Sequence, residues 1–189
     1  MIIAKRRSDI RNWPIYHHKI GNDKKMYLND IQAESSSTNW GSTTPTSSVF
    51  SIGSADDING NGSTYIAYCF AEKKGFSKFG SYSGNLSDDG TFVYTGFKPA
   101  WVMIKGSTTA ESWHIWNDAV SPSNVIQDYL LANASNAENN SSARAIDFLS
   151  NGFKCRTSDN SMNHANTYIY MAFAENPLVT TGKIPATAR

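Results

Sequence analysis

The sequence predicts an all-β protein, and three observations lead to that prediction. The 189 residues include 69 Ser, Thr, Asn and Gly residues, which favour turns, and 23 aromatic residues, which favour strands, but only six leucines. Apolar side chains recur in short stretches bounded by Gly, Asn, Ser or Pro, which is typical of strands. A hydrophobic fraction of 40% and a net charge of +1 argue against a disordered chain.

An internal repeat of about 100 residues organises the chain. Thr64–Glu72 aligns with Thr167–Glu175 and shares six of nine residues, and Trp13–Tyr16 aligns with Trp113–Trp116. The offset drifts between 100 and 104, so the insertions fall in polar loops. A unit of this length fits a small β-sandwich. We therefore expect two related antiparallel β-sandwiches in tandem.

The expected strands are short stretches of aromatic or β-branched residues between turn signals. In the first repeat they are Ile2–Lys5, Trp13–Tyr16, Met26–Leu28, Val49–Ile52 and Thr64–Ala71. In the second repeat they are Phe92–Phe97, Trp101–Lys105, Trp113–Trp116, Tyr129–Ala132, Ala145–Phe148, Gly152–Arg156 and Thr167–Ala174. The polar segments 35–48 and 134–143 are expected to be loops, and no helix longer than a turn or two is supported.

The expected domains are residues 1–82, the first repeat, and residues 83–189, the second repeat with a C-terminal tail. The strand Phe92–Phe97 opens the second repeat, and we expect it beside Thr167–Ala174 or the neighbour of that strand. The first repeat has no equivalent opening strand. Either the chain is a piece of a longer one, or another segment supplies the strand.

Gly75–Tyr82 is the nearest candidate for that missing strand, because three of its aromatic residues are spaced by three. We expect this segment to cover the open edge of the first sandwich, so that Phe79→Ala destabilises that sandwich selectively. The alternative is an exposed linker, in which the same substitution would have almost no effect.

Charge and hydropathy exclude several classes of partner. A net charge of +1 argues against nucleic acid, which requires a basic surplus, and no apolar run is long enough to span a bilayer. Met1–Ala4 precedes a basic cluster, which reverses the charge order of a signal peptide. Cys69 and Cys155 make no disulfide framework, and Cys69 lies in a strand that reads as buried.

No arrangement of residues in the sequence indicates catalysis, so we expect neither an enzyme nor a cofactor. Glu72 and Glu175 are repeat equivalents, and carboxylates in separate sandwiches lie too far apart for glycoside hydrolysis. We interpret both as structural, capping a backbone turn. The four histidines lack a Ser-His-Asp spacing, and no G-x-S-x-G motif is present. They are His17, His18, His114 and His164.

Two tryptophans are the candidates for ligand contact, since exposed aromatic rings stack on sugar rings. Trp40 lies in a polar loop, and Trp116 points outward if its neighbour Ile115 belongs to the core. A weak calcium candidate is the run that contains Asp57, Asn59 and Asn61, which fits the first half of a calcium-binding loop. Its second half fails, because the twelfth position lacks Glu, so a hairpin turn is the preferred interpretation.

Three stretches resemble the signature of a repeat domain in virion proteins of tailed bacteriophages, especially marine phages. Glu72–Asn85, together with the preceding residues, resembles FAExxGFSKFGSYxGN, Asp89–Lys105 resembles DGTFVYTGFKPAxVMIK, and Leu149–Lys154 resembles LSNGFK. The resemblance covers nearly the whole chain and implies a virion structural protein with a jelly-roll or concanavalin-like sandwich. It fixes no catalytic residue, and the absent opening strand departs from its pattern.

The expected function is that of a non-enzymatic virion component, on a tail fibre, elsewhere on the tail, or on the capsid surface. The alternative is a lectin-like module that binds a host glycan, and a polysaccharide depolymerase is a third possibility. The expected partners are other virion proteins and further copies of the chain, preferably as a trimer. A surface glycan of the host is an additional candidate partner.

Overall fold

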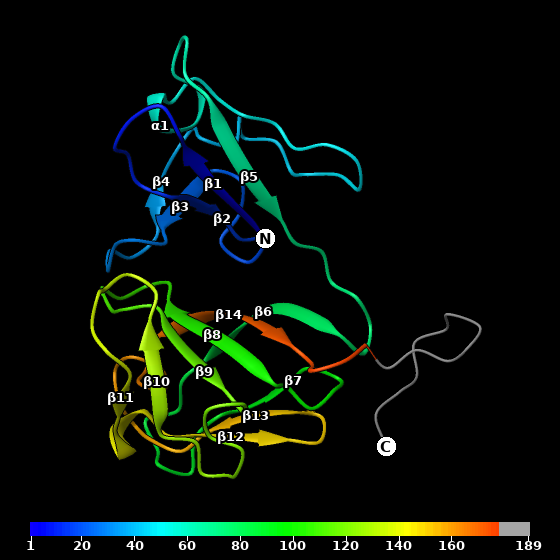
Figure 1. Ribbon diagram of the computed structural model, residues 1–189, viewed down its shortest axis with the longest axis vertical. Coiled ribbons are helices and arrows are strands. Elements are labelled where there is room, and N and C mark those ends of the chain that lie inside the picture. The colour runs from blue at the N-terminus through cyan, green and yellow to red at the C-terminus, as the bar shows by residue number, and fades with distance from the viewer. Residues whose placement is uncertain (178–189) are drawn as a thin grey trace, which may run out of the picture. The chain divides into compact units, whose positions relative to one another are not determined.

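The computed structural model describes residues 1–177 and confirms the all-β prediction (Figure 1). Among these residues the secondary structure consists of fourteen strands, one short α-helix and one 3-10 helix. The chain divides into two compact units, the first covering Met1–Phe70 and the second beginning at Ala71.

The first unit is built on one antiparallel sheet of five strands in the order β4-β3-β2-β1-β5. The strands are β1 (Ile2–Arg6), β2 (Pro14–Tyr16), β3 (Lys24–Tyr27), β4 (Ser35–Ser36) and β5 (Tyr65–Cys69). Helix α1 (Asp56–Asn59) and the loop before it lie against the sheet. There Trp40 and Ile58 pack with Ile2, Ala4 and Tyr16 in one buried cluster. Because no second sheet is present in this part of the chain, the prediction of a first sandwich is wrong.

The second unit contains two sheets, as the sequence predicted for a sandwich. The larger has the order β11-β10-β9-β8-β14-β6 and the smaller the order β12-β13-β7. The larger sheet consists of β6 (Ser77–Ser83), β8 (Trp101–Gly106), β9 (His114–Asn117), β10 (Asp128–Leu131), β11 (Asn139–Asn140) and β14 (Thr167–Phe173). The smaller sheet consists of β7 (Phe92–Tyr94), β12 (Ile146–Leu149) and β13 (Gly152–Cys155), with a 3-10 helix at Ser142–Arg144 before β12.

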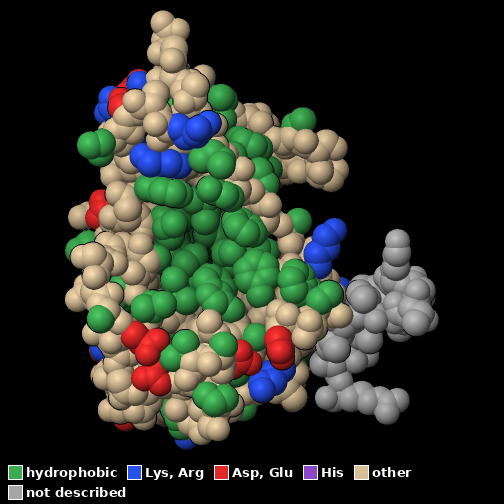
Figure 2. All heavy atoms as spheres, in the orientation of Figure 1, with side chains coloured by type: hydrophobic (Ala, Val, Ile, Leu, Met, Phe, Trp, Pro, Cys, Tyr) green, Lys and Arg blue, Asp and Glu red, His purple; other side chains and the backbone are tan. Residues whose placement is uncertain are grey.

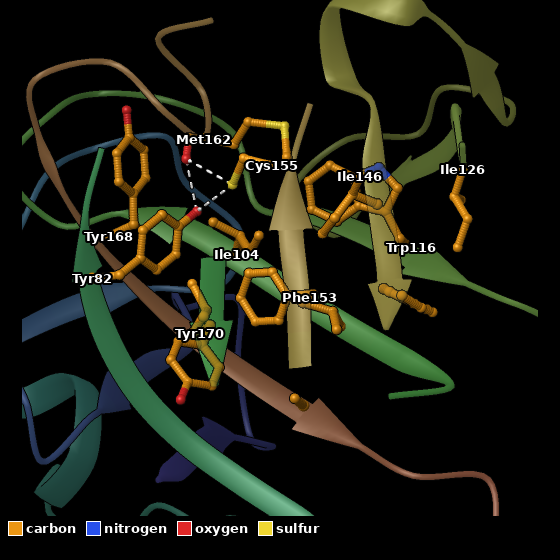
Figure 3. Packing of buried hydrophobic residues seen from close by; sticks show 14 of the residues in the cluster. Tyr82, Ile104, Trp116, Ile126, Ile146, Phe153, Cys155, Met162, Tyr168 and Tyr170 are labelled. Carbon is orange, nitrogen blue, oxygen red and sulfur yellow. Dashed lines mark hydrogen bonds between the residues drawn. The ribbon is translucent and has the colours of Figure 1, made fainter. Parts of the chain in front are cut away.

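The core of the second unit lies between its two sheets (Figure 3). Phe153 and Ile146 of the smaller sheet meet Tyr170 and Trp116 of the larger sheet. The Tyr82 hydroxyl donates a hydrogen bond to the backbone carbonyl of Met162 at 2.7 Å, and the buried Sγ of Cys155 lies within reach of both partners. Burial raises the pKa of the Cys155 thiol to about 12, so this cysteine stays protonated and packs as a small apolar group.

The sequence repeat reappears as a repeated pattern of strand pairing. Ile2 pairs with Cys69 between β1 and β5, and the aligned residues Val102 and Ala172 pair between β8 and β14. The pairs β1–β2 and β8–β9 match at an offset of 100, and β3–β4 and β10–β11 match at 104. The order β4-β3-β2-β1-β5 therefore corresponds strand for strand to β11-β10-β9-β8-β14.

Several expectations from the sequence are wrong in this structure. The segment Gly75–Tyr82 does not cover the first unit, because β6 pairs along its full length with β14 of the second unit. Residues 71–82 belong to the second unit, whereas the predicted first domain extends to residue 82. Strand β7 joins β13 in the smaller sheet and not β14. Cys69 is exposed, because β5 forms an uncovered edge of its sheet.

Candidate functional site

A depression of about 550 Å³ on the second unit is the best candidate for a binding site. It lies where the chain enters β6, beside the end of β7 and the turn between β12 and β13. Its lining residues are Glu72, Lys73, Lys74, Gly75, Ser77, Lys78, Tyr94, Thr95, Gly96 and Asn151. All of them come from Glu72–Asn85, Asp89–Lys105 and Leu149–Lys154, and the last of these stretches is remote in sequence from the other two.

One wall of the depression is held in place by a tight turn after β7. The backbone N–H groups of Thr95 and Gly96 both donate to the carbonyl of Asn151, at 3.0 and 3.1 Å. Gly96 has φ of +85°, a conformation that favours glycine. The Thr95 hydroxyl donates to the Phe97 carbonyl at 2.6 Å. These bonds fix the backbone that presents Tyr94 to solvent.

The opposite wall is held by Glu72, which acts as the structural cap that the sequence analysis expected. One carboxylate oxygen accepts a hydrogen bond from the Phe79 N–H at 3.2 Å, and the other lies 3.3 Å from the Lys78 ammonium. Lys73 and Ser77 form an isolated antiparallel bridge that closes the turn. Glu72 is therefore occupied in holding the backbone of β6.

The groups that remain available to a ligand are an aromatic ring and two ammonium groups. Tyr94 is 63% exposed, and Lys73 and Lys74 are exposed and have no carboxylate at ion-pair distance within residues 1–177. An exposed tyrosine ring offers a face for stacking on the C–H face of a sugar, and the ammonium groups attract an anion. This combination fits an acidic saccharide.

Tyr94 is not among the candidate residues predicted from the sequence, although the strand pattern carries a signal for it. In β7 the side chains alternate, so that Val93 is buried while Phe92 and Tyr94 are exposed. Alternation around a valine in the expected strand Phe92–Phe97 would have placed both aromatic residues outside the core.

The two tryptophans chosen from the sequence lie elsewhere, and the prediction that they are exposed is wrong. Trp40 and Trp116 are both 0% exposed. Trp40 packs edge-on against Tyr16 under the first sheet, with ring centroids 5.7 Å apart. Trp116 faces the space between the two sheets, and its indole N–H donates to the Arg144 carbonyl at 2.9 Å. Neither ring is accessible to a sugar.

The weak calcium candidate forms a different structure. Asp57 and Asn59 lie in α1, and a carboxylate oxygen of Asp57 lies 3.1 Å from the Lys25 ammonium and 2.9 Å from the Tyr27 hydroxyl. Burial alone would raise the pKa of Asp57, but the hydrogen bonds from Tyr27 and Lys25 outweigh it and lower the pKa. The Asn59 amide donates to the Gly53 carbonyl, and Asn61 is exposed. No cluster of three metal-ligating side chains occurs between residues 1 and 177.

A second depression, of about 530 Å³, lies on the first unit. Its lining residues are Asp23, Lys25, Ser36, Ser37, Thr38, Asn39 and Ala55. Several of its polar groups bond one another, although the buried Nδ2 of Asn39 has no hydrogen-bond partner within residues 1–177. The side-chain oxygen of Asn39 accepts hydrogen bonds from the Ser37 hydroxyl and the Lys25 ammonium. The Lys25 ammonium also forms an ion pair with Asp57. The depression on the second unit, whose two lysine ammonium groups have no carboxylate at ion-pair distance in the described part of the chain, is therefore the stronger candidate.

The fold and this site define a class, namely an all-β protein made of repeated antiparallel sheets with a polar surface depression. The chain belongs to the family described as Domain of unknown function (DUF7483), whose model matches residues 1–177. No curated protein sequence and no solved structure is significantly similar to the chain. None of the helices in the described part has the length and apolar character needed to cross a membrane.

Proposed function

We propose that the protein is a non-enzymatic structural component of a bacteriophage virion, located on a tail fibre, elsewhere on the tail, or on the capsid surface. The observation that carries the proposal is the literal resemblance of three stretches to the virion repeat signature. The duplicated pattern of strand pairing supports it, because a repeated β unit with polar loops suits a building block that displays a surface.

The roles of the signature residues also support a structural function. The Gly80 backbone approaches the Tyr170 ring so closely that an added Cβ would lie 2.6 Å from it. The N–H groups of Asn85 and Thr91 both donate to the buried side chain of Asn163. These residues determine how the chain folds.

Mass spectrometry of purified virions tests this proposal, with capsids and tails analysed separately. We expect peptides from both units in one of the two fractions, at the stoichiometry of a structural subunit. Absence from particles that contain the other structural proteins would contradict the proposal. Turnover of a polysaccharide that is lost in Glu72→Gln or Glu175→Gln would instead support a depolymerase.

A second candidate function is glycan binding during host recognition, and the depression beside Tyr94 favours it. The three stretches meet there around an exposed aromatic ring and two exposed ammonium groups that have no carboxylate at ion-pair distance within residues 1–177. An array of acidic and neutral glycans tests this function. We expect binding to acidic glycans that falls at least tenfold in Tyr94→Ala and in the double variant Lys73→Ala/Lys74→Ala.

The matched control for that array is Tyr68→Ala, which removes another exposed tyrosine, in the first unit. Its binding should equal that of the unmodified chain. An array without signal, measured on folded protein, would count against glycan recognition.

A further inference from the structure

The two units differ at one edge of their equivalent sheets. In the second unit, β14 lies between β8 and β6. In the first unit, the equivalent strand β5 pairs with β1 and ends the sheet (Figure 1). Strand β6 lies beside β14 in the second unit. In the described part of the chain, no strand lies at the equivalent place beside β5.

The backbone of β5 presents hydrogen-bonding groups to this edge. Met1 and Phe70 exchange backbone hydrogen bonds, so alternate residues of β5 bond to β1. The residues between them, Tyr65, Ala67 and Cys69, direct their N–H and C=O groups outward. No hydrogen bond to these groups is found within residues 1–177.

The equivalent groups of the second unit are paired. At the repeat offset of 103, Tyr65 and Ala67 correspond to Tyr168 and Tyr170, which lie opposite Tyr82 and Gly80 of β6. This equivalence predicts the register of a strand added to β5. The residues of the added strand would pair with β5 as the residues of β6 pair with β14. Unpaired edges of this kind accept extended peptides.

The Tyr65 hydroxyl makes the same pattern of hydrogen bonds as the hydroxyl of its counterpart Tyr168, whose ring contacts β6. Its hydroxyl donates to the Asp56 carbonyl at 3.0 Å and accepts from the Gly60 N–H at 2.7 Å. In the second unit, the Tyr168 hydroxyl donates to the Asn160 carbonyl at 2.7 Å and accepts from the His164 N–H at 3.0 Å. So fixed, the Tyr168 ring stacks on Tyr82 with ring centroids 5.2 Å apart.

The side chains along β5 are correspondingly uncovered. Ala67 and Cys69 lie opposite Ala4 and Ile2, on the sheet face that forms the core of the first unit, yet both are exposed. Their counterparts in β14 are 5% and 0% exposed. Hydrophobic side chains gather around β5 and beside β1 on the face of the first unit seen in Figure 2. The core face is thus left open at this edge.

We propose that the β5 edge binds an extended segment with the sequence pattern of β6, by antiparallel strand addition, with an aromatic residue stacked on Tyr65. The segment comes from a neighbouring protein that carries a repeat of this family. In the second unit, the Tyr170 ring crowds Gly80 of β6. Because the first unit has Ala67 in place of Tyr170, the residue opposite Ala67 need not be glycine. The proposal is independent of the phage assignment, since it rests on the comparison of the two units.

The test uses the full chain and a synthetic peptide with the sequence of residues 76–85, FSKFGSYSGN. We expect saturable binding, slower amide exchange at Tyr65, Ala67 and Cys69, and slower alkylation of the exposed Cys69 thiol. A peptide with Ala in place of Tyr82 should bind about tenfold more weakly, because it cannot stack on Tyr65.

Ala67→Pro is the matched protein variant, because it removes an outward N–H while β1 keeps its bonds to Ile66 and Tyr68. Peptide binding should be lost while circular dichroism and thermal unfolding are retained. If this variant does not fold, coupling a bulky maleimide to Cys69 should block the edge and abolish binding.

Three results would overturn the proposal. The first is the absence of saturable peptide binding to the folded chain. The second is protection from amide exchange that is confined to β6 and β14, which would indicate that the peptide displaces β6 within the second unit. The third is self-association that Ala67→Pro abolishes while the peptide does not bind, which would identify a second copy of the chain as the occupant.

Discussion

Single buried polar residues set the conditions under which the second unit is stable. His114 is 3% exposed, stacks on Trp116 with ring centroids 5.8 Å apart, and has Nδ1 3.1 Å from the Ser112 carbonyl. Burial, reinforced by the positive charge of Arg144, lowers the pKa of His114 to about 4. The ring is therefore neutral in the folded protein at neutral pH.

The titration of His114 predicts a specific pH dependence of stability. Its pKa is about 6.5 when unfolded and about 4 when folded, so the unfolded chain binds the extra proton between these values. Stability from this group is fully present above pH 6.5 and falls as the pH drops to 4, by at most about 3 kcal/mol. Urea unfolding across this range should show a flatter profile in His114→Gln. The exposed His164→Gln should keep the original profile.

Asn163 connects two loops of the second unit from a fully buried position. Its amide nitrogen donates to the side chain of Asn85 and to the carbonyls of Ser87 and Thr157, each at 2.8 Å, and its oxygen accepts the N–H of Thr91. Asn163→Ala leaves these groups without partners and should lower the free energy of unfolding by about 2–4 kcal/mol. Chemical denaturation should show no such loss in the exposed control Asn136→Ala.

At the scale of elements, β6 contributes to the second unit from the segment that joins the two repeats. It pairs with β14 over seven residues, from Ser77 opposite Phe173 to Ser83 opposite Thr167. Phe79 is 2% exposed and packs edge-on against Phe173, with ring centroids 6.0 Å apart. The connection between the repeats is therefore neither an exposed linker nor a cover for the first sheet.

Phe79→Ala should destabilise the second unit, by about 3–5 kcal/mol, because it opens a cavity beside Phe173. Hydrogen exchange followed along the chain should show faster exchange in β14 and unchanged exchange in β1 and β2. Ser81→Ala, an exposed substitution in the same strand, is the control. Faster exchange in the first unit alone would support the original assignment of this segment.

For the whole molecule, near-zero net charge favours association between copies of the chain. The chain carries 17 basic and 16 acidic residues, so electrostatic repulsion between copies is weak. We expect a homo-oligomer, preferably a trimer, because closed symmetry is the common outcome for identical subunits. Multi-angle light scattering at micromolar concentration measures this directly. A monomeric mass would contradict self-association.

The repeat made much of the fold predictable from the sequence. The candidate site was not predictable, because its lining residues come together only in the folded chain. Alignment at offsets of 100 to 104 anticipated the equivalent strand pairs, since equivalent residues favour equivalent pairing. The predicted outward orientation of Trp116 is wrong, because its indole faces the smaller sheet while Ile115 is only partly buried. Tyr94 and Lys73 line the depression together with Asn151 of the β12–β13 turn, which is remote from both in sequence.

The sequence by itself determined the all-β class, the duplication and most strand positions, because these follow from local composition and from patterns that repeat along the chain. Only the tertiary structure decided which sheet each strand joins. Strand β6 could border either β5 or β14, since both carry the repeated sequence, and its pairing with β14 leaves β5 as an open edge. Long-range hydrogen bonding and the covering of an apolar face made that choice, and neither is encoded in a local pattern.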